Sequence, residues 1–413
     1  MTMMKFLRTA SRGRLLATLA GMVVVVFGGT AIAVAAAGSG PVPPAKPLAQ
    51  AIHDGLAAPP VQGITADISF TNHLIPASNL GGSNPILSGA TGRMWLSADH
   101  RLRLELQSAN GDAQVVLNGS SFWVYEPSSK TVYEGSLPAG AGKREQPHKD
   151  HGLPTVAQIQ SELNRLAAHL NLSGAQPSDV AGQAAYTVRV SPRHDGGLLG
   201  AAEVAWDSGH GVPLRFAVYA QNSAAPVLEL KATNISFGPL AASTFAIAPP
   251  SGAKVVTVQT RGVGGRGHGY VKGRARHREI TGTAAVTRAL PFALEAPGQL
   301  VGLPRRSVKL LDWGGHPAAL VTYGQNLGGI AVIEQSAAQA RTPANPSAGA
   351  DKRSGSGERR QGLNLPTVSV NGVTGQELDT ALGTMVRFAR GGVTFTVIGS
   401  VPPAAADAAA RGL

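Results

Sequence analysis

The feature that most constrains the fold is a long series of short segments in which apolar and polar residues alternate. In Ile64–Phe70, apolar side chains occupy every second position, and Thr65, Asp67 and Ser69 fall between them. A period of two places one set of side chains on each face of a β-strand. The same alternation recurs, with Gly, Asn or Asp at turns, in 101–106, 115–125, 186–190, 204–206, 214–218 and 228–230. The sequence therefore predicts a large antiparallel sheet with one apolar face.

One segment inside this series has a helical period instead. Its apolar residues are three or four positions apart: Val156, Ile159, Leu163, Leu166 and Leu170. This spacing predicts one amphipathic helix whose apolar stripe the sheet covers. A shorter helix is expected over Pro47–Leu56.

Length and charge divide the chain. Its 413 residues favour two folded units. The net charge is +12, of which residues 1–50 carry +5 and residues 251–280 carry +6, leaving +1 for the rest. The folded parts are therefore nearly neutral, and the basicity indicates a targeting segment and a linker rather than a nucleic-acid surface.

The N-terminus has the pattern of an export signal. Basic residues at Lys5, Arg8, Arg12 and Arg14 precede an uncharged apolar run, Leu15–Ala37. The run suits either a cleaved signal peptide or a retained membrane anchor, and both place the body outside the cytoplasm. The chain has no cysteine, which excludes structural disulfides and thiolate metal sites.

The expected organisation has four parts. Residues 1–45 form the signal peptide or anchor with a spacer, 46–250 the large sheet, 251–284 a basic Gly/Arg linker and 285–413 a small α+β domain, with a disordered insertion at 341–362. The strands expected in the small domain are Ser307–Asp312, Ala318–Tyr323, Gly329–Glu334, Thr367–Val370, Thr384–Arg390 and Val393–Ile398. Pro402 and Pro403 then end the last strand, and a helix is expected over Ala404–Arg411.

Three segments resemble known envelope proteins. The strand–Gly–Pro-Pro–helix ending is similar to the C-terminal domain of the sigma-E regulatory protein family RseB/MucB. Leu117–Pro127 with Val132-Tyr133, and Val204–Asp207 with Val212–Arg215, resemble the lipoprotein-carrier (LolA-like) family. The resemblance implies a mainly β fold with helices (α+β): an incomplete antiparallel β-barrel with a helical lid, plus a small C-terminal α+β domain. It also implies a partner, the exported domain of an anti-sigma factor or membrane sensor.

An incomplete barrel leaves an apolar concave face that can hold lipid or lipoprotein acyl chains, although the same residues also suit a closed core. The candidate cavity residues are Leu102, Leu104, Leu106, Phe122, Val124, Ile159, Leu163 and Leu166. The candidates for an anionic lipid or wall-polymer surface, in what is otherwise a solvated linker, are Arg261, Arg266, Lys272, Arg274, Arg276 and Arg278.

Enzymatic chemistry has little support in the sequence. His148-Lys149-Asp150-His151 lies in a Gly/Pro/Lys-rich stretch and is interpreted as a solvated loop. Gly140–Arg144 lacks the Ser/Thr of a phosphate-binding loop. We therefore expect no catalysis, metal or cofactor. Three functions stay open: an envelope regulator that binds an anti-sigma factor, a lipid or lipoprotein carrier, and a structural module of the cell envelope.

Overall fold

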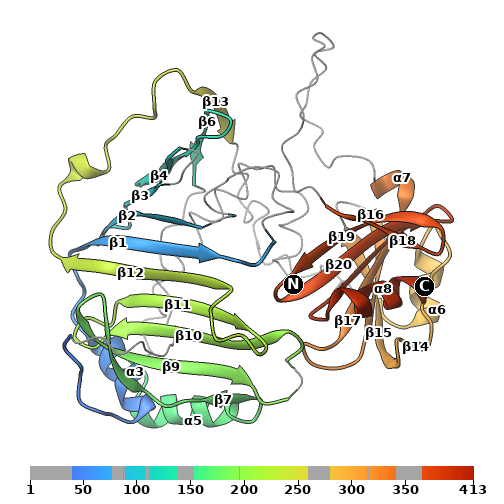
Figure 1. The fold of residues 1–413 in the computed structure, drawn as a ribbon, viewed down its shortest axis with the longest axis horizontal. Helices are drawn as coiled ribbons and strands as arrows, with labels where there is room; N and C mark the ends of the chain where they lie inside the picture. Colours follow the sequence, from blue (N-terminus) through green and yellow to red (C-terminus); the bar gives the residue numbers. More distant parts are fainter. Residues whose placement is uncertain are drawn as a thin grey trace, which may run out of the picture.

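The structure, a computed structural model, describes residues 40–76, 87, 89–107, 111–137, 153–194, 196–258, 280–313, 316–340 and 365–413. These residues form a first sheet of 13 strands and a second sheet of eight (Figure 1). The first sheet has the order β13-β6-β5-β4-β3-β2-β1-β12-β11-β10-β9-β7, and β8 also pairs with β9. Its strands are β1 (Gly63–Asn72), β2 (Ala90–Ser97), β3 (Leu102–Gln107), β4 (Ala113–Asn118), β5 (Ser121–Glu126), β6 (Thr131–Ser136), β7 (Leu170–Leu172), β8 (Gln176–Val180), β9 (Gln183–Pro192), β10 (Leu199–Asp207), β11 (Pro213–Ala220), β12 (Leu228–Phe237) and β13 (Lys254–Val258).

The first sheet is antiparallel apart from the pairing of β13 with β6, and it curls along its length (Figure 1). Strand β1 joins its two halves by pairing with β2 on one side and β12 on the other. Strands β13 and β7 lie at opposite ends of the order. The mainly β class and the curled antiparallel sheet confirm the coarse prediction from period-2 segments.

Two helices accompany this sheet, α3 (Leu48–Ala57) and α5 (Val156–Leu166). Helix α5 begins with a capping box, in which Thr155 and Gln158 exchange side-chain to backbone hydrogen bonds. The helix ends at Leu166, so its predicted extension to Leu170 is wrong. After a turn at 167–169, Leu170 enters β7 and pairs with Pro192, because strand pairing overrides the helical spacing there.

The second sheet is antiparallel, with the order β14-β15-β16-β17-β21-β20-β19-β18. Its strands are β14 (Gln299–Leu300), β15 (Leu303–Trp313), β16 (His316–Tyr323), β17 (Ile330–Ser336), β18 (Thr367–Val370), β19 (Val373–Thr380), β20 (Gly383–Arg390) and β21 (Val393–Gly399). The accompanying helices are α6 (Thr283–Ala289), α7 (Ala337–Ala340) and α8 (Pro403–Arg411). Ala406, Ala409 and Ala410 of α8 are buried against a core that includes Val397 and Phe395. The strand–Pro-Pro–helix ending thus forms β21 and α8 as expected.

Two features of the C-terminal half differ from the sequence expectation. Strand β19 was not predicted, because Gly375, Glu377 and Asp379 interrupt its apolar pattern. Strand β13 lies inside the segment expected as linker, because Lys254–Val258 pairs with Thr131–Gly135 and extends the first sheet.

Several expectations lie outside the described residues. These are the apolar N-terminal run at 15–37, the loop motifs at 140–144 and 148–151, the basic residues at 261–278 and the insertion at 341–362. Within the part of the chain that is described, no helix has the length and apolar character needed to span a bilayer.

Candidate functional site

One face of the first sheet is apolar along most of its width. On β1, Ala66 lies opposite Met94 and Ile235, and Ile68 lies opposite Ala232. On the next strands, Leu104 lies opposite Met94 and Val115. These side chains are all at most 9% exposed and belong to one continuous cluster. We call this side of the sheet the apolar face and the opposite side the polar face.

The apolar face contains a small pocket of about 20 Å³. Strands β1, β12, β11 and β10, which are neighbours in the sheet, supply its walls. The lining residues are Ala66, Ile68, Val204, Pro213, Leu214, Arg215, Phe216, Leu230, Ala232 and Ile235. Arg215 alone among them is charged, and its guanidinium group lies on the polar face, where it binds Glu203 and Glu229. The pocket surface is therefore hydrocarbon and offers no polar group for orienting a reaction.

Five of the predicted cavity residues belong to the same apolar cluster as the pocket. These are Leu102, Leu104, Leu106, Phe122 and Val124, which are 0–6% exposed. They lie on β3 and β5, which β2 separates from the pocket strand β1, and they are not among the lining residues of the pocket.

The three predicted helical residues lie elsewhere. Ile159 and Leu163 of α5 pack against Ala49 of α3 in a separate cluster. Leu166 is 48% exposed. Only part of the expected apolar stripe is therefore buried. The buried part of α5 packs against α3 and Leu172 of β7, and it does not belong to the cluster that lines the pocket.

The sequence contained a signal for most of the pocket. Six lining residues lie in segments with period-2 alternation: Ala66, Ile68, Val204, Leu214, Phe216 and Leu230. Ala232 continues the period of Leu228 and Leu230, whereas Ile235 departs from it, because a register shift opposite Asp67 and Ile68 leaves Thr233 without an opposite residue in β1. Strand order decides which alternating segments become neighbours, and alternation alone does not give that order.

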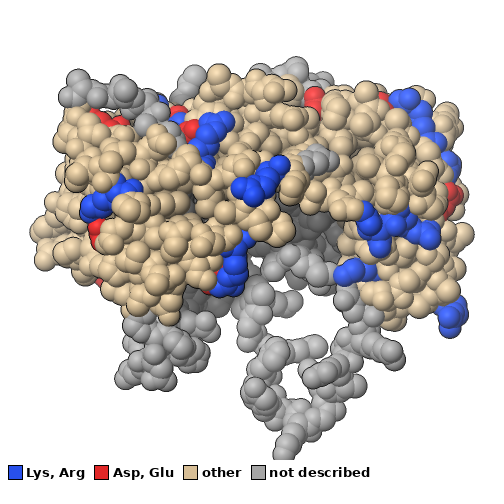
Figure 2. Space-filling model, turned by 90° about the horizontal axis from the view of Figure 1, so that it is seen from below, with Lys and Arg blue, Asp and Glu red and all other residues tan. Residues whose placement is uncertain are grey.

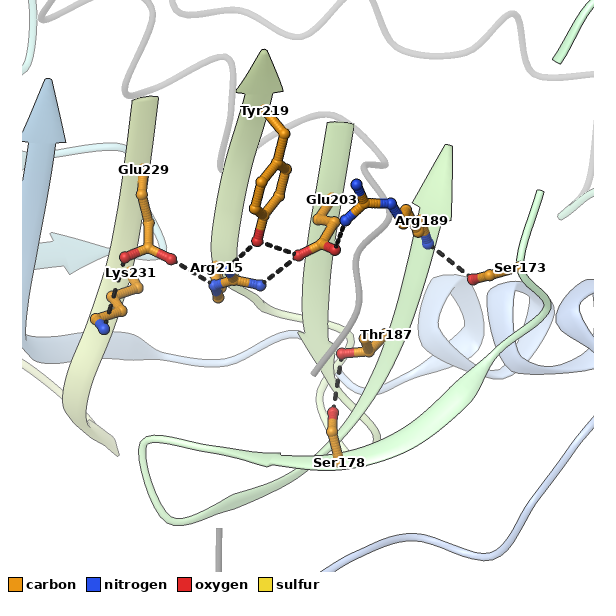
Figure 3. Close-up of polar contacts among 9 residues, drawn as sticks. All are labelled: Ser173, Ser178, Thr187, Arg189, Glu203, Arg215, Tyr219, Glu229 and Lys231. Atoms are coloured by element: carbon orange, nitrogen blue, oxygen red, sulfur yellow. Dashed lines mark hydrogen bonds and ion pairs between the residues drawn. The ribbon is translucent and has the colours of Figure 1, made fainter. Parts of the chain in front are cut away.

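The polar face of the same strands carries a buried ionic network (Figure 3). Arg215 donates to Glu203 at 2.9 Å and to Glu229 at 2.7 Å, and Arg189 donates to Glu203 at 2.6 Å. The Tyr219 hydroxyl donates to Glu203 at 2.6 Å and accepts from Arg215 at 2.7 Å. The network ties β9, β10, β11 and β12 together directly behind the pocket.

The network has the character of a structural element. Glu203 and Glu229 side chains are 7% and 10% exposed, and each has a cationic partner. Burial alone lowers the pKa of Arg215, but hydrogen bonds to Tyr219, Glu229 and Glu203 together raise it above its ordinary value. The arginine thus stays charged and the carboxylates stay paired, which favours a fixed strand register over proton transfer.

Other chemistry is sparse in the described part of the chain. No group of three or more His, Asp or Glu residues there is arranged to hold a metal ion. Figure 2 shows Lys and Arg side chains dispersed over the face that it draws rather than gathered in one patch. In the second sheet, burial raises the pKa of Glu334 to about 8.

Comparisons with known proteins give likeness in structure only. No family model matches the chain, and no curated protein matches it. The structure of MucB in complex with MucA(peri) is 16% identical, with 88% of this chain and 94% of that chain covered and a TM-score of 0.36. The Pseudomonas aeruginosa MucA/MucB complex is 17% identical over 88% and 94%, with a TM-score of 0.34. A LolA superfamily protein from Nitrosomonas europaea is 9% identical over 49% and 99%, with a TM-score of 0.20. These low values assign neither a function nor a partner to the present chain.

Proposed function

We propose that this protein is a non-catalytic, extracytoplasmic binder of acyl chains and that the pocket on the apolar face is its binding site. One observation carries the proposal: four adjacent strands line a small hydrocarbon pocket on a continuous apolar face, which an acyl chain would widen on entry. Burying a methylene group contributes about 0.8 kcal/mol, so a chain of about 16 carbons offers on the order of 10 kcal/mol before ordering costs. Binding of this kind needs no polar motif.

The proposed biological role is regulatory. The RseB/MucB-like ending, which forms β21 and α8, favours a partner that is the exported part of an anti-sigma factor or of another membrane sensor. The acyl chain would then be the signal, supplied by a lipid or a lipoprotein. Residues 15–37 would export or anchor the chain, and the basic residues at 261–278 would attract anionic lipid headgroups at up to about 1 kcal/mol per charge.

A second candidate is carriage of lipid or lipoprotein, for which the same pocket is the supporting observation. The two roles differ in what the occupied protein does next. A regulator changes its affinity for a protein partner, whereas a carrier transfers its ligand to a membrane.

Native mass spectrometry of the purified protein, followed by lipid extraction, tests the proposal. Stoichiometric acyl species that co-purify support it, and Ala232→Leu, which fills the pocket, should reduce them. Repeated recovery of the folded protein without any acyl species, also after incubation with palmitate, contradicts it and favours a closed structural module. Capture of a single-pass anti-sigma protein by the loaded but not the empty form separates regulation from carriage.

A further inference from the structure

Two segments of the first sheet are hydrogen-bonded to the second sheet. The N–H of Leu198, just before β10, lies 3.0 Å from Oγ and 3.1 Å from the carbonyl oxygen of Ser400, which follows β21. The carbonyl oxygen of Leu74, just after β1, accepts a hydrogen bond of 2.9 Å from the N–H of Ala381. The Ser400 hydroxyl also donates to the carbonyl of Leu382 at 2.8 Å. Ser400 therefore connects the two contacts, because its hydroxyl bonds to Leu382, which is the neighbour of Ala381 in the turn that contacts Leu74.

The two contacts lie on the outer strands of the pocket. The four lining strands have the order β1-β12-β11-β10, so β1 and β10 flank the other two. Both contacts are made at the same end of the first sheet, where Figure 1 shows the second sheet. The second sheet thus bridges the pocket strands from one side to the other.

The approach at Ser400 is close and requires a glycine. Gly197 has a φ of +58°, and a Cβ atom there would lie 2.3 Å from the Ser400 carbonyl oxygen. An L-side chain at this position is therefore excluded twice, by the backbone conformation and by the contact. Movement of the second sheet away from the first would break this close contact between Gly197 and Ser400.

The pocket itself is narrow in this arrangement. Its side chains Ile68, Val204, Leu214 and Ile235 are 3–6% exposed. The four lining strands are paired as neighbours, so an acyl chain enters by spreading the side chains on the apolar face, which flattens the sheet between β1 and β10. A change in the curvature of the sheet acts on the two contacts that bridge these strands.

We propose that Thr380–Leu382 and Ser400 form a clamp that regulates the pocket, an inference that rests on the proposed function. The clamp fixes the curvature of the sheet between β1 and β10 and keeps the pocket narrow. Acyl-chain entry loosens the clamp, and a loosened clamp favours entry, because coupling between two sites is reciprocal. An acyl chain in the pocket would in this way weaken the contacts between the first sheet and the second sheet.

Ser400→Ala tests the clamp, and Ser223→Ala is its matched control. Ser223 lies between β11 and β12 at the same end of the sheet, and its hydroxyl bonds locally to Ala225. In the full chain without ligand, hydrogen exchange should rise about fivefold at both the Leu198 and Ala381 amides in Ser400→Ala and at neither in Ser223→Ala. A change at Leu198 with none at Ala381 overturns the inference, because the two contacts would then be independent.

The affinity for 11-(dansylamino)undecanoic acid gives the second readout. Ser400→Ala should bind this probe about two- to tenfold more tightly than the wild type, and Ser223→Ala should match the wild type. If the wild type binds the probe and Ser400→Ala binds it with the same affinity, the clamp is wrong and the proposed function stands. Absence of binding in all three proteins overturns the proposed function and the clamp's regulatory role with it.

Discussion

The carboxylate of Glu334 accepts a hydrogen bond from the backbone N–H of Glu295 at 2.9 Å through Oε2, while Oε1 has no partner among the described residues. Glu334 is fully buried on β17, between β16 and β21, and the nearby Tyr323 hydroxyl is also buried and has no hydrogen-bond partner in the described part of the chain. A charge at this position would be poorly compensated. Burial accordingly raises the pKa of Glu334 from 4.5 to about 8.

The first prediction is that the second sheet loses stability as pH rises from about 4.5 to about 8. The folded protein holds the Glu334 proton more tightly than the unfolded chain, so the stabilisation is fully present below pH 4.5 and is lost as pH rises through about 8. The loss should be on the order of 3–5 kcal/mol. Thermal unfolding between pH 4.5 and pH 8.5 should show this loss in the wild type and not in Glu334→Gln. Glu295→Gln, which removes a half-exposed acid nearby, should keep the wild-type pH dependence.

The second prediction concerns the network behind the pocket. Arg215→Met leaves Glu203 and Glu229 buried without their shared partner, and it should destabilise the first sheet by about 3–5 kcal/mol. Lys231→Met is the control, because Lys231 is 42% exposed and lies 3.5 Å from Glu229; its cost should stay below about 1 kcal/mol. Equal urea midpoints for the two variants would show that the arginine does not hold the strands.

A third prediction compares two residues on the apolar stripe of α5. Leu163→Asp should cost about 3 kcal/mol, because Leu163 packs between α5 and α3. Leu166→Asp should cost no more than about 0.5 kcal/mol, because Leu166 is 48% exposed. Urea unfolding measures both, and a large loss in Leu166→Asp would mean that this residue is covered in solution.

These residues show how far the sequence predicts the structure. Alternation identified the apolar side chains of β1, β3, β10 and β11, because a half-buried strand requires that period. It did not show that β12 lies between β1 and β11, since strand order depends on long-range pairing. Helical spacing placed Leu163 and Leu166 on one stripe, yet α3 covers only the first of them. The ionic network was also missed, because Glu203, Arg215 and Glu229 become neighbours only through the register of three strands.

The fourth prediction fills the pocket. Ala232→Leu adds methyl and methylene groups to a lining position that is 9% exposed, and it should weaken probe affinity about tenfold while costing about 1–3 kcal/mol of stability. Thr91→Leu adds a similar apolar volume on the polar face, where the side chain is exposed, and it should bind like the wild type. Fluorescence titration with 11-(dansylamino)undecanoic acid compares them. Equal affinities would place the ligand outside this pocket.

The central claim, that acyl chains bind between β1 and β10, is tested most directly by photo-cross-linking the full chain to a diazirine-bearing palmitate and mapping the adducts by tandem mass spectrometry. We predict adducts on β1, β10, β11 and β12 that compete with unlabelled palmitate and decrease in Ala232→Leu. Adducts confined to α5 or to the second sheet, or none that palmitate displaces, would contradict it.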